Sequence, residues 1–159
     1  MPSPSFRSSA ERTIAMEAAA VSDLAAQLDD DFSVACDLIL SCSGRVVVVG
    51  MGKSGHIGNK IAATLASTGT PAFFVHPAEA SHGDLGMITK ADVVIALSNS
   101  GSTGEVVSLL PLIKRLGVPL ISMTGAPNSV LAKASDAHLN SAVKEEACPL
   151  DLAPASSTT

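Results

Sequence analysis

The sequence predicts an α/β domain whose mostly five-stranded parallel sheet is covered by helices on both faces. Apolar runs of strand length alternate with segments at helical spacing. The run at Val46–Val49 has no polar alternation, as expected of a strand buried on both faces. Small, polar turns follow these apolar runs. Strands alternating with helices indicate a doubly wound parallel sheet, and 159 residues suit one such domain.

Two helices are expected to precede the sheet. Residues 1–9 are rich in Ser and Pro, and we expect them to be disordered. Ala10–Leu28 is Ala-rich with apolar residues near helical spacing, and it predicts one helix. Phe32–Leu40 predicts a second helix, which Ser43-Gly44 ends. Leading helices outside a strand–helix–strand unit often pack against another subunit, so we expect an oligomer.

The remaining elements alternate along the chain. We expect strands at Arg45–Val49, Ala72–Val75, Asp92–Leu97, Val118–Met123 and Ala137–Val143. We expect helices at Ser54–Thr68, from Gly104 to Leu116 and at Asn128–Ala134, and a loop at Pro77–Lys90. Ligands of such sheets bind at the carboxyl ends of the strands. Polar turns lie at three of these ends, after Val49, Leu97 and Val143.

The composition argues against several classes of protein. The chain has no Trp or Tyr, only four Phe and a formal net charge of −5, which argues against nucleic-acid binding. It has no apolar run long enough to span a membrane and no secretory signal pattern, so we expect a cytoplasmic protein. The spacing of Cys36, Cys42 and Cys148 predicts reduced thiols.

The first candidate motif is the glycine-rich turn Gly50–Gly55, which follows a strand and opens a helix. Small residues let the backbone approach an anion, and the helix N-terminus supplies free N–H groups. The spacing also fits a dinucleotide fingerprint, but the expected acidic residue is missing after the next strand, where Glu79 lies beyond Pro77. A nucleotide-hydrolysing loop fits less well, because Val47 stands where its leading Gly belongs. A tight turn with a solvated Lys53 is a further alternative.

The second motif is Ser98–Thr103, which we call the phosphate loop: Ser98, Asn99, Ser100, Gly101, Ser102 and Thr103. Hydroxyls and backbone N–H groups at the end of a central strand can hold a phosphate without arginine. The alternative is helix capping by Ser102 or Thr103, with Glu105 in the first turn. Capping needs one hydroxyl or amide side chain, so the presence of five such side chains in the loop favours phosphate binding.

These residues resemble the S-x-S-G-x-T motif of SIS (sugar isomerase) domains. Further segments resemble the arabinose 5-phosphate isomerase family: Gly50–Gly58, Ser67–Pro71, His82–Gly86 and Glu146–Leu150. The resemblance covers residues 10–159, which we take as one SIS isomerase domain with a flavodoxin-like fold.

The resemblance implies that D-ribulose 5-phosphate and D-arabinose 5-phosphate are interconverted, without a cofactor or required metal, to supply Kdo for lipopolysaccharide. It also implies a homotetramer and catalytic roles for Lys53, Glu105 and Glu146. The phosphate loop would bind the substrate phosphate. Gly52, Ser54 and His82 would lie near the substrate, and His82 matches a histidine associated with inhibitory zinc in some members.

The chemistry suits these residue types. Isomerisation moves a proton between adjacent carbons, which a carboxylate base can do, and a cation can stabilise the enediolate. Adjacent carboxylates such as Glu145 and Glu146 are usually solvated surface; the family pattern selects Glu146, directly before Ala147.

The chain also departs from the family pattern. Ser102 stands in place of a Glu, and Asp151 in place of a Gly. Ser156–Thr159 resembles the cap of a further helix, after which the family has a histidine-bearing segment and paired CBS regulatory domains. On this reading the chain is C-terminally truncated, and we expect residues 1–159 to fold marginally, associate, and show weak binding and turnover.

Two other functions stay open. The chain can be a non-catalytic sugar-phosphate sensor, as in SIS-bearing transcriptional regulators, although residues 1–44 are short and acidic for their DNA-binding domain. It can also be an isomerase of another sugar phosphate, since pocket shape sets that choice.

Overall fold

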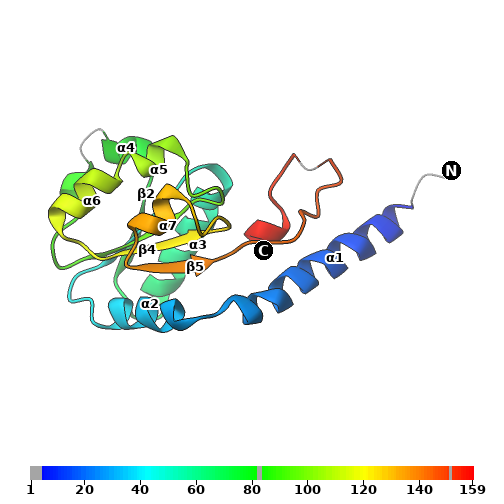
Figure 1. Ribbon diagram of the computed structural model, residues 1–159, viewed down its shortest axis with the longest axis horizontal. Coiled ribbons are helices and arrows are strands. Elements are labelled where there is room, and N and C mark those ends of the chain that lie inside the picture. The colour runs from blue at the N-terminus through cyan, green and yellow to red at the C-terminus, as the bar shows by residue number, and fades with distance from the viewer. Residues whose placement is uncertain (1–4, 82–83, 151) are drawn as a thin grey trace.

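The computed structural model describes residues 5–81, 84–150 and 152–159, and its centre is a five-stranded sheet (Figure 1). The strands are all parallel and lie in the order β2-β1-β3-β4-β5. Their bounds are β1 Val46–Gly50, β2 Ala72–Val75, β3 Val93–Leu97, β4 Leu120–Thr124 and β5 Ala137–Asn140. This order is that of the flavodoxin-like folds, so the predicted fold class is confirmed.

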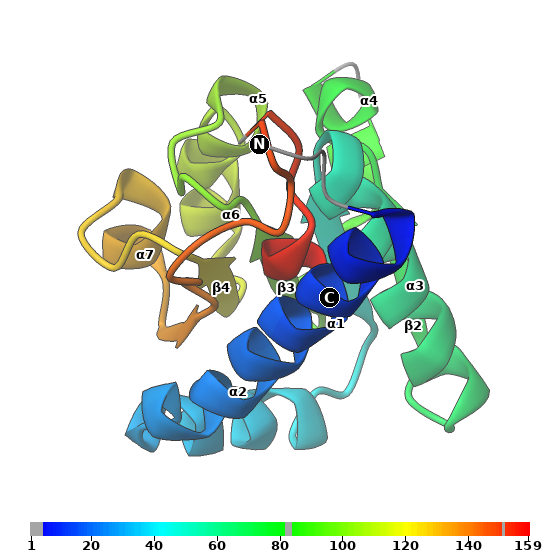
Figure 2. The same ribbon diagram turned by 90° about the vertical axis from the view of Figure 1, so that its right-hand side faces the viewer.

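Both faces of the sheet are buried, and alternate residues of each strand serve different faces. Val47 and Val49 of β1 pack with helices α5 (Gly104–Val107), α6 (Leu110–Leu116) and α7 (Val130–Ala134). Val46 and Val48 pack with helices α2 (Asp30–Leu40) and α3 (Gly52–Ser67). Figure 2 shows these two helical layers on either side of the strands. Burial on both faces explains why the strands read as unbroken apolar runs.

The chain begins with a long helix that extends beyond the sheet domain. Helix α1 spans Phe6–Asp23, with Ser5 as its N-cap, and the short 3-10 helix η1 follows at Leu24–Gln27. The expected disorder over residues 1–9 is therefore wrong for residues 6–9, which are helical. None of the residues of α1 is buried, and Figure 1 shows the helix running away from the body of the domain.

Two expected elements are built differently. The single helix expected between Gly104 and Leu116 is broken into α5 and α6 at Ser108 and Leu109. Pro111 explains the break, since it has no N–H for the preceding turn and its ring clashes with a helical carbonyl. The expected loop at 77–90 contains helix α4 (Pro77–Ser81) and 3-10 helix η2 (Asp84–Met87).

The C-terminal segment leaves the sheet and returns to its carboxyl edge. Strand β5 ends at Asn140 rather than at Val143. The chain then runs outward and folds into the 3-10 helix η3 (Ser156–Thr158), which contacts α1 and α3 (Figure 1). Within the described ranges, no helix is long and apolar enough to cross a membrane.

Candidate functional site

The two predicted motifs lie side by side at the carboxyl edge of the sheet. Gly50, at the end of β1, is in register with Leu97, at the end of β3. The glycine-rich turn therefore begins beside the phosphate loop. From β1 the chain adds β2 on one side, and it then adds β3, β4 and β5 on the other side. The boundary between β1 and β3 is therefore a topological switch point, where open α/β sheets bind ligands.

The base of the phosphate loop is held by hydrogen bonds. Ser98 is buried, and its Oγ lies 2.8 Å from Thr103 Oγ1. Gly101 N donates to Ser98 O at 2.9 Å, which closes the turn. Gly101 has a φ of +60°, and a Cβ there would collide with the Ser129 side chain, so only glycine fits.

The tip of the phosphate loop faces solvent. Asn99, Ser100 and Ser102 are exposed. Ser100 Oγ accepts hydrogen bonds from Ser102 N at 3.3 Å and Ser102 Oγ at 3.1 Å. These exposed groups can exchange their mutual hydrogen bonds for bonds to a phosphate, which accepts several donors at once.

The capping alternative for this loop is only partly right. Thr103 occupies the N-cap position of α5, but its side chain makes no capping hydrogen bond. Its hydroxyl pairs with Ser98 instead. Glu105 lies exposed in the first turn of α5. The hydroxyls are thus arranged to shape the loop.

The glycine-rich turn has two positions that require glycine. Gly52 begins α3 with a φ of +54°, and a Cβ on Gly55 would approach Gly50 O to 2.7 Å. The close packing brings the first turn of α3 against the end of β1. Lys53 is exposed in that turn and has no hydrogen-bond or ion-pair partner among the described residues. Ser54 is half-buried beside it.

The dinucleotide alternative lacks its acidic partner in space as well. Strand β2 ends at Val75, and Glu79 lies in helix α4, beyond Pro77. No carboxylate follows β2 directly, where a ribose would be held.

Glu146 lies on the segment that follows β5 and is held by the C-terminal turn. Its Oε2 accepts hydrogen bonds from Ala155 N at 2.7 Å and Ser157 N at 3.3 Å. Partial burial raises the pKa of Glu146, but the hydrogen bonds from Ser157 and Ala155 outweigh it and lower the pKa below its ordinary value. Glu146 is therefore a carboxylate at neutral pH.

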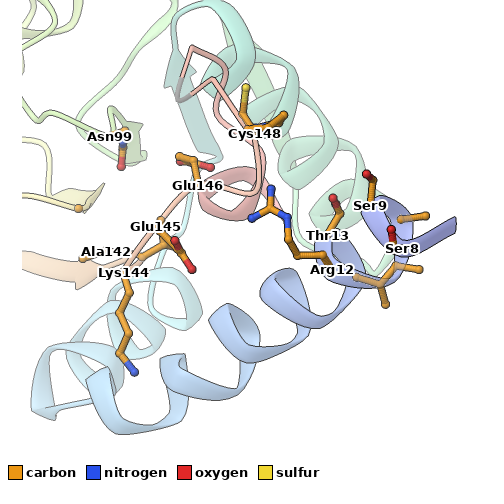
Figure 3. Close-up of a pocket in the computed structure, with 15 residues that line it drawn as sticks. Ser8, Ser9, Arg12, Thr13, Asn99, Ala142, Lys144, Glu145, Glu146 and Cys148 are labelled. Atoms are coloured by element: carbon orange, nitrogen blue, oxygen red, sulfur yellow. The ribbon is translucent and has the colours of Figure 1, made fainter. Parts of the chain in front are cut away.

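A large open cavity of about 1360 Å³ lies between this segment and helix α1. Asn99 lines it from the phosphate loop, Glu145 and Glu146 from the segment after β5, and Arg12 from α1. In Figure 3 Arg12 reaches from α1 toward this segment, where its guanidinium donates to Ala147 O at 3.3 Å, and Asn99 lies across the cavity.

Comparison with known proteins decides the family. The SIS domain family matches residues 39–159. This chain belongs to the SIS domain family. Its residues 39–159 include every strand of the sheet and both motifs, so the predicted resemblance is confirmed.

Close relatives share nearly all of this SIS chain. It is 71% identical over 154 residues to the arabinose 5-phosphate isomerase KdsD of Pseudomonas aeruginosa, which covers 97% of this chain and 47% of that protein. It is 56% identical over 154 residues to KdsD of Escherichia coli K12, with the same coverage, 97% and 47%. The chain thus spans about half the length of the curated relatives it matches.

Solved structures agree with this fold. A protein of E. coli CFT073 in complex with arabinose 5-phosphate superposes with a TM-score of 0.93 at 44% identity, covering 99% of this chain and 84% of that one. A candidate phosphosugar isomerase involved in capsule formation in Bacteroides fragilis gives 0.92 at 39% identity, covering 97% and 82%. The Vibrio vulnificus NanR protein, at 22% identity and a TM-score of 0.77 over 96% of this chain and 55% of that one, shares the fold.

The SIS chain gathers some of the predicted site residues and separates others. Ser54, Ser98 and Asn99 line one small cavity of about 210 Å³. Glu146 faces the large cavity, whereas Lys53 and Glu105 are exposed at helix starts and line neither of these two cavities.

His82 lies outside the described residues, as do Gly83 and Asp151. Among the described residues, no group of three or more His, Cys, Asp or Glu side chains could hold a metal ion.

The C-terminal turn is a feature that the sequence reading missed. The small cavity that Ser98 lines is also lined by Ser156, Ser157, Thr158 and Thr159. Ser156 Oγ also accepts from Ala147 N at 3.1 Å, beside Glu146. The run of four hydroxyl residues could have indicated this position, and the prediction that it caps a further helix stays a prediction.

Proposed function

We propose that this chain is the isomerase domain of an enzyme that interconverts D-ribulose 5-phosphate and D-arabinose 5-phosphate. The observation that carries the proposal is the position of the phosphate loop at the switch point, directly beside the glycine-rich turn. The names of the relatives, arabinose 5-phosphate isomerases at 71% and 56% identity, support the choice of substrate. Supply of Kdo for lipopolysaccharide belongs to the same proposal.

The phosphate loop would bind the substrate phosphate. The exposed side chains of Asn99, Ser100 and Ser102 would donate hydrogen bonds to phosphate oxygens. Ser98 and Thr103 would hold the base of the loop through the 2.8 Å contact between their hydroxyl oxygens. The first turn of α3, which contains Gly52 and Ser54, would also lie near the substrate and would donate backbone N–H groups to it. The loop itself carries no charged side chain, so Lys53 is the nearest cation in the two motifs.

The proposed chemistry is a proton transfer through an enediol. A carboxylate removes the proton on C2 of the aldose, O1 gains a proton while O2 loses one, and a proton is returned to C1 to give the ketose. Glu105 and Glu146 are the two candidates for this base, and Lys53 would stabilise the negative charge of the enediolate. The lowered pKa of Glu146 keeps it ionised, as a base requires, but makes it a weaker base than an ordinary glutamate.

The substrate panel tests this proposal. The full-length protein is incubated with matched aldose and ketose phosphates of five, six and seven carbons, and interconversion is followed by NMR. We expect the fastest turnover with the arabinose and ribulose 5-phosphates. Faster turnover of another aldose and ketose phosphate pair would mean that this other pair is the substrate. Binding without any turnover would favour the sensor, for which the likeness to NanR supports the fold alone.

We also propose that copies of the chain assemble through helix α1. Its residues Phe6, Ile14 and Val21 are large apolar side chains with exposed fractions of 97%, 67% and 50%. A helix with no buried residue and so much apolar surface gains stability when a second chain covers it. A tetramer is the assembly that the family resemblance implies.

A further inference from the structure

We propose that Thr124 and His138 form a positioning pair that holds the phosphate loop in its binding geometry. Neither residue lines the two cavities described above, so the pair would act through the loop that connects β4 to α7. The inference rests on the proposed function, because it concerns the same phosphate loop. It adds two residues to which the motifs gave no role.

The hydroxyl of Thr124 joins two parts of the chain. Thr124 is the last residue of β4 and is fully buried. Its Oγ1 accepts a hydrogen bond from Ala126 N at 2.9 Å and lies 3.1 Å from His138 Nε2 on the neighbouring strand β5. The first residues of the β4–α7 loop are thereby fixed to the sheet.

The β4–α7 loop and the first turn of α7 hold the phosphate loop by backbone hydrogen bonds. Gly125 N donates to Asn99 O at 2.9 Å, and Leu131 N donates to Gly101 O at 3.0 Å. These bonds fix the backbone at two of the six positions of the phosphate loop. A shift of the β4–α7 loop must therefore move the phosphate loop or break the bond between Gly125 and Asn99.

The two loops are closely packed against each other. A Cβ on Gly125 would come within 2.8 Å of Asn99 Oδ1, and a Cβ on Gly101 would collide with Ser129. The same added Cβ on Gly101 would lie 3.3 Å from Thr124 Cγ2, so the methyl group of Thr124 lies next to the phosphate loop itself. The methyl of Thr124 thus lies beside the loop, and its hydroxyl makes the hydrogen bonds that carry the support.

His138 is anchored independently of Thr124. Its backbone N donates to Asp31 Oδ2 at 2.8 Å, from the first turn of helix α2. This bond satisfies an N–H on the outer edge of β5 and fixes the strand that carries the imidazole. The connection therefore runs from α2 through His138 and Thr124 to the phosphate loop.

A second buried hydroxyl contact, between Ser122 of β4 and Ser135, offers a matched control. Ser122 is fully buried on the same face of β4, and its Oγ lies 2.8 Å from Ser135 Oγ. The Ser135 hydroxyl donates to Ala132 O at 2.7 Å, so this pair ties the C-terminal end of α7 to the sheet and itself bonds neither the β4–α7 loop nor the phosphate loop. Removing it tests the loss of a buried hydroxyl pair without the loop contact.

The experiment compares Thr124→Val, Thr124→Ser, His138→Leu and Ser122→Ala in the full-length protein. Calorimetry measures the affinity for D-arabinose 5-phosphate and for inorganic phosphate, and hydrogen exchange measures protection of the Gly125 and Ala126 amides. We expect Thr124→Val and His138→Leu to weaken both affinities about tenfold and to lower the protection of both amides. Thr124→Ser, which keeps the hydroxyl, should stay within about threefold of wild type, and so should Ser122→Ala.

Two results would overturn the inference. One is wild-type protection of Gly125 and Ala126 in folded Thr124→Val and His138→Leu proteins. The other is a loss of affinity in Ser122→Ala as large as in Thr124→Val, because the effect would then be general destabilisation. A wild-type protein that binds no sugar phosphate would instead contradict the proposed function, and the amide protection would still decide for or against the positioning pair.

Discussion

Ser98 Oγ and Thr103 Oγ1 lie 2.8 Å apart across the base of the phosphate loop, while the hydroxyls of Ser100 and Ser102 lie exposed at its tip. The loop therefore divides its hydroxyl groups between two tasks. The pair at the base, of which Ser98 is buried and Thr103 half-buried, closes the loop, and the exposed pair is free to contact a ligand. Substitutions at the two levels should have different effects.

Ser100→Ala should weaken sugar-phosphate binding without affecting the fold. Ser100 Oγ is exposed and, among the residues that the structure describes, accepts hydrogen bonds from Ser102 alone, so its loss leaves no buried group there without a partner. A hydrogen bond to a charged group contributes about 1.5–3 kcal/mol, which predicts a loss of affinity of roughly tenfold or more. Calorimetry with D-arabinose 5-phosphate measures it. Ser108→Ala, at an exposed hydroxyl on the same stretch of chain but outside the loop, is the control. Equal affinities in the two variants would remove Ser100 from the site.

Glu105→Gln and Glu146→Gln should each lower turnover far more than binding. A positioned acid or base contributes about 10²–10⁴-fold to the rate, and a neutral amide cannot accept the proton. Steady-state kinetics on the full-length protein separate the two effects. Glu79→Gln is the control, because Glu79 is an exposed carboxylate on α4 that lines neither cavity. The assignment fails if both variants keep the wild-type turnover.

Lys53→Ala should also reduce turnover, through loss of the positive charge beside the enediolate. Lys60, exposed on the same helix α3, supplies the comparison, and Lys60→Ala should leave turnover unchanged. If the two alanine variants are equally active, Lys53 is a solvated surface residue, which is the alternative that its exposure favours.

Asp92 should stabilise the domain in a pH-dependent way. Burial raises its pKa, but hydrogen bonds from Thr89 and Arg45 outweigh burial, and the pKa is lowered overall. A lowered folded pKa gives stability that is present above the unfolded value, about 3.9, and lost as pH falls through the folded value. Asp92→Asn should lower the free energy of unfolding by about 1.5–3 kcal/mol at pH 7 and by less in acid.

Urea unfolding at pH 7 and pH 3 measures this difference. The control is Asp37→Asn, at an exposed carboxylate on helix α2, which should change little at either pH. A loss of stability in Asp92→Asn that is as large at pH 3 as at pH 7 would mean that the charge of Asp92 is not responsible.

The apolar surface of helix α1 predicts how the protein assembles. Ile14→Asp together with Val21→Asp should shift the protein to smaller species in analytical ultracentrifugation, because charges would replace apolar contact. Ala18→Asp or Ala19→Asp would place a similar charge between them and map the contact face. An unchanged sedimentation profile in the double variant would remove α1 from the interface.

The sequence predicted the sheet well because its signals are local. The run Val46–Val49 is fully buried, so burial itself produces the pattern from which the strand was predicted. The helix break before Pro111 was also readable in the sequence, but helical spacing on both sides of it concealed the break.

Contacts between distant segments could not be predicted in this way. Glu146 is bound by Ala155 and Ser157, which lie 9 and 11 residues along the chain, and no spacing pattern encodes that turn. The pairing of Thr124 with His138 depends likewise on the register of β4 against β5. Long-range packing decides these contacts, so the motifs identified the site residues without their partners.

The measurement that tests the central claim most directly is isomerisation in D₂O. The full-length protein is incubated with D-arabinose 5-phosphate, and NMR follows both the sugar and its deuterium content. Proton transfer through an enediol predicts D-ribulose 5-phosphate with deuterium from solvent on C1, and much slower formation of it by the Glu105→Gln and Glu146→Gln proteins. A protein that binds D-arabinose 5-phosphate but leaves it unchanged and without deuterium would contradict the account.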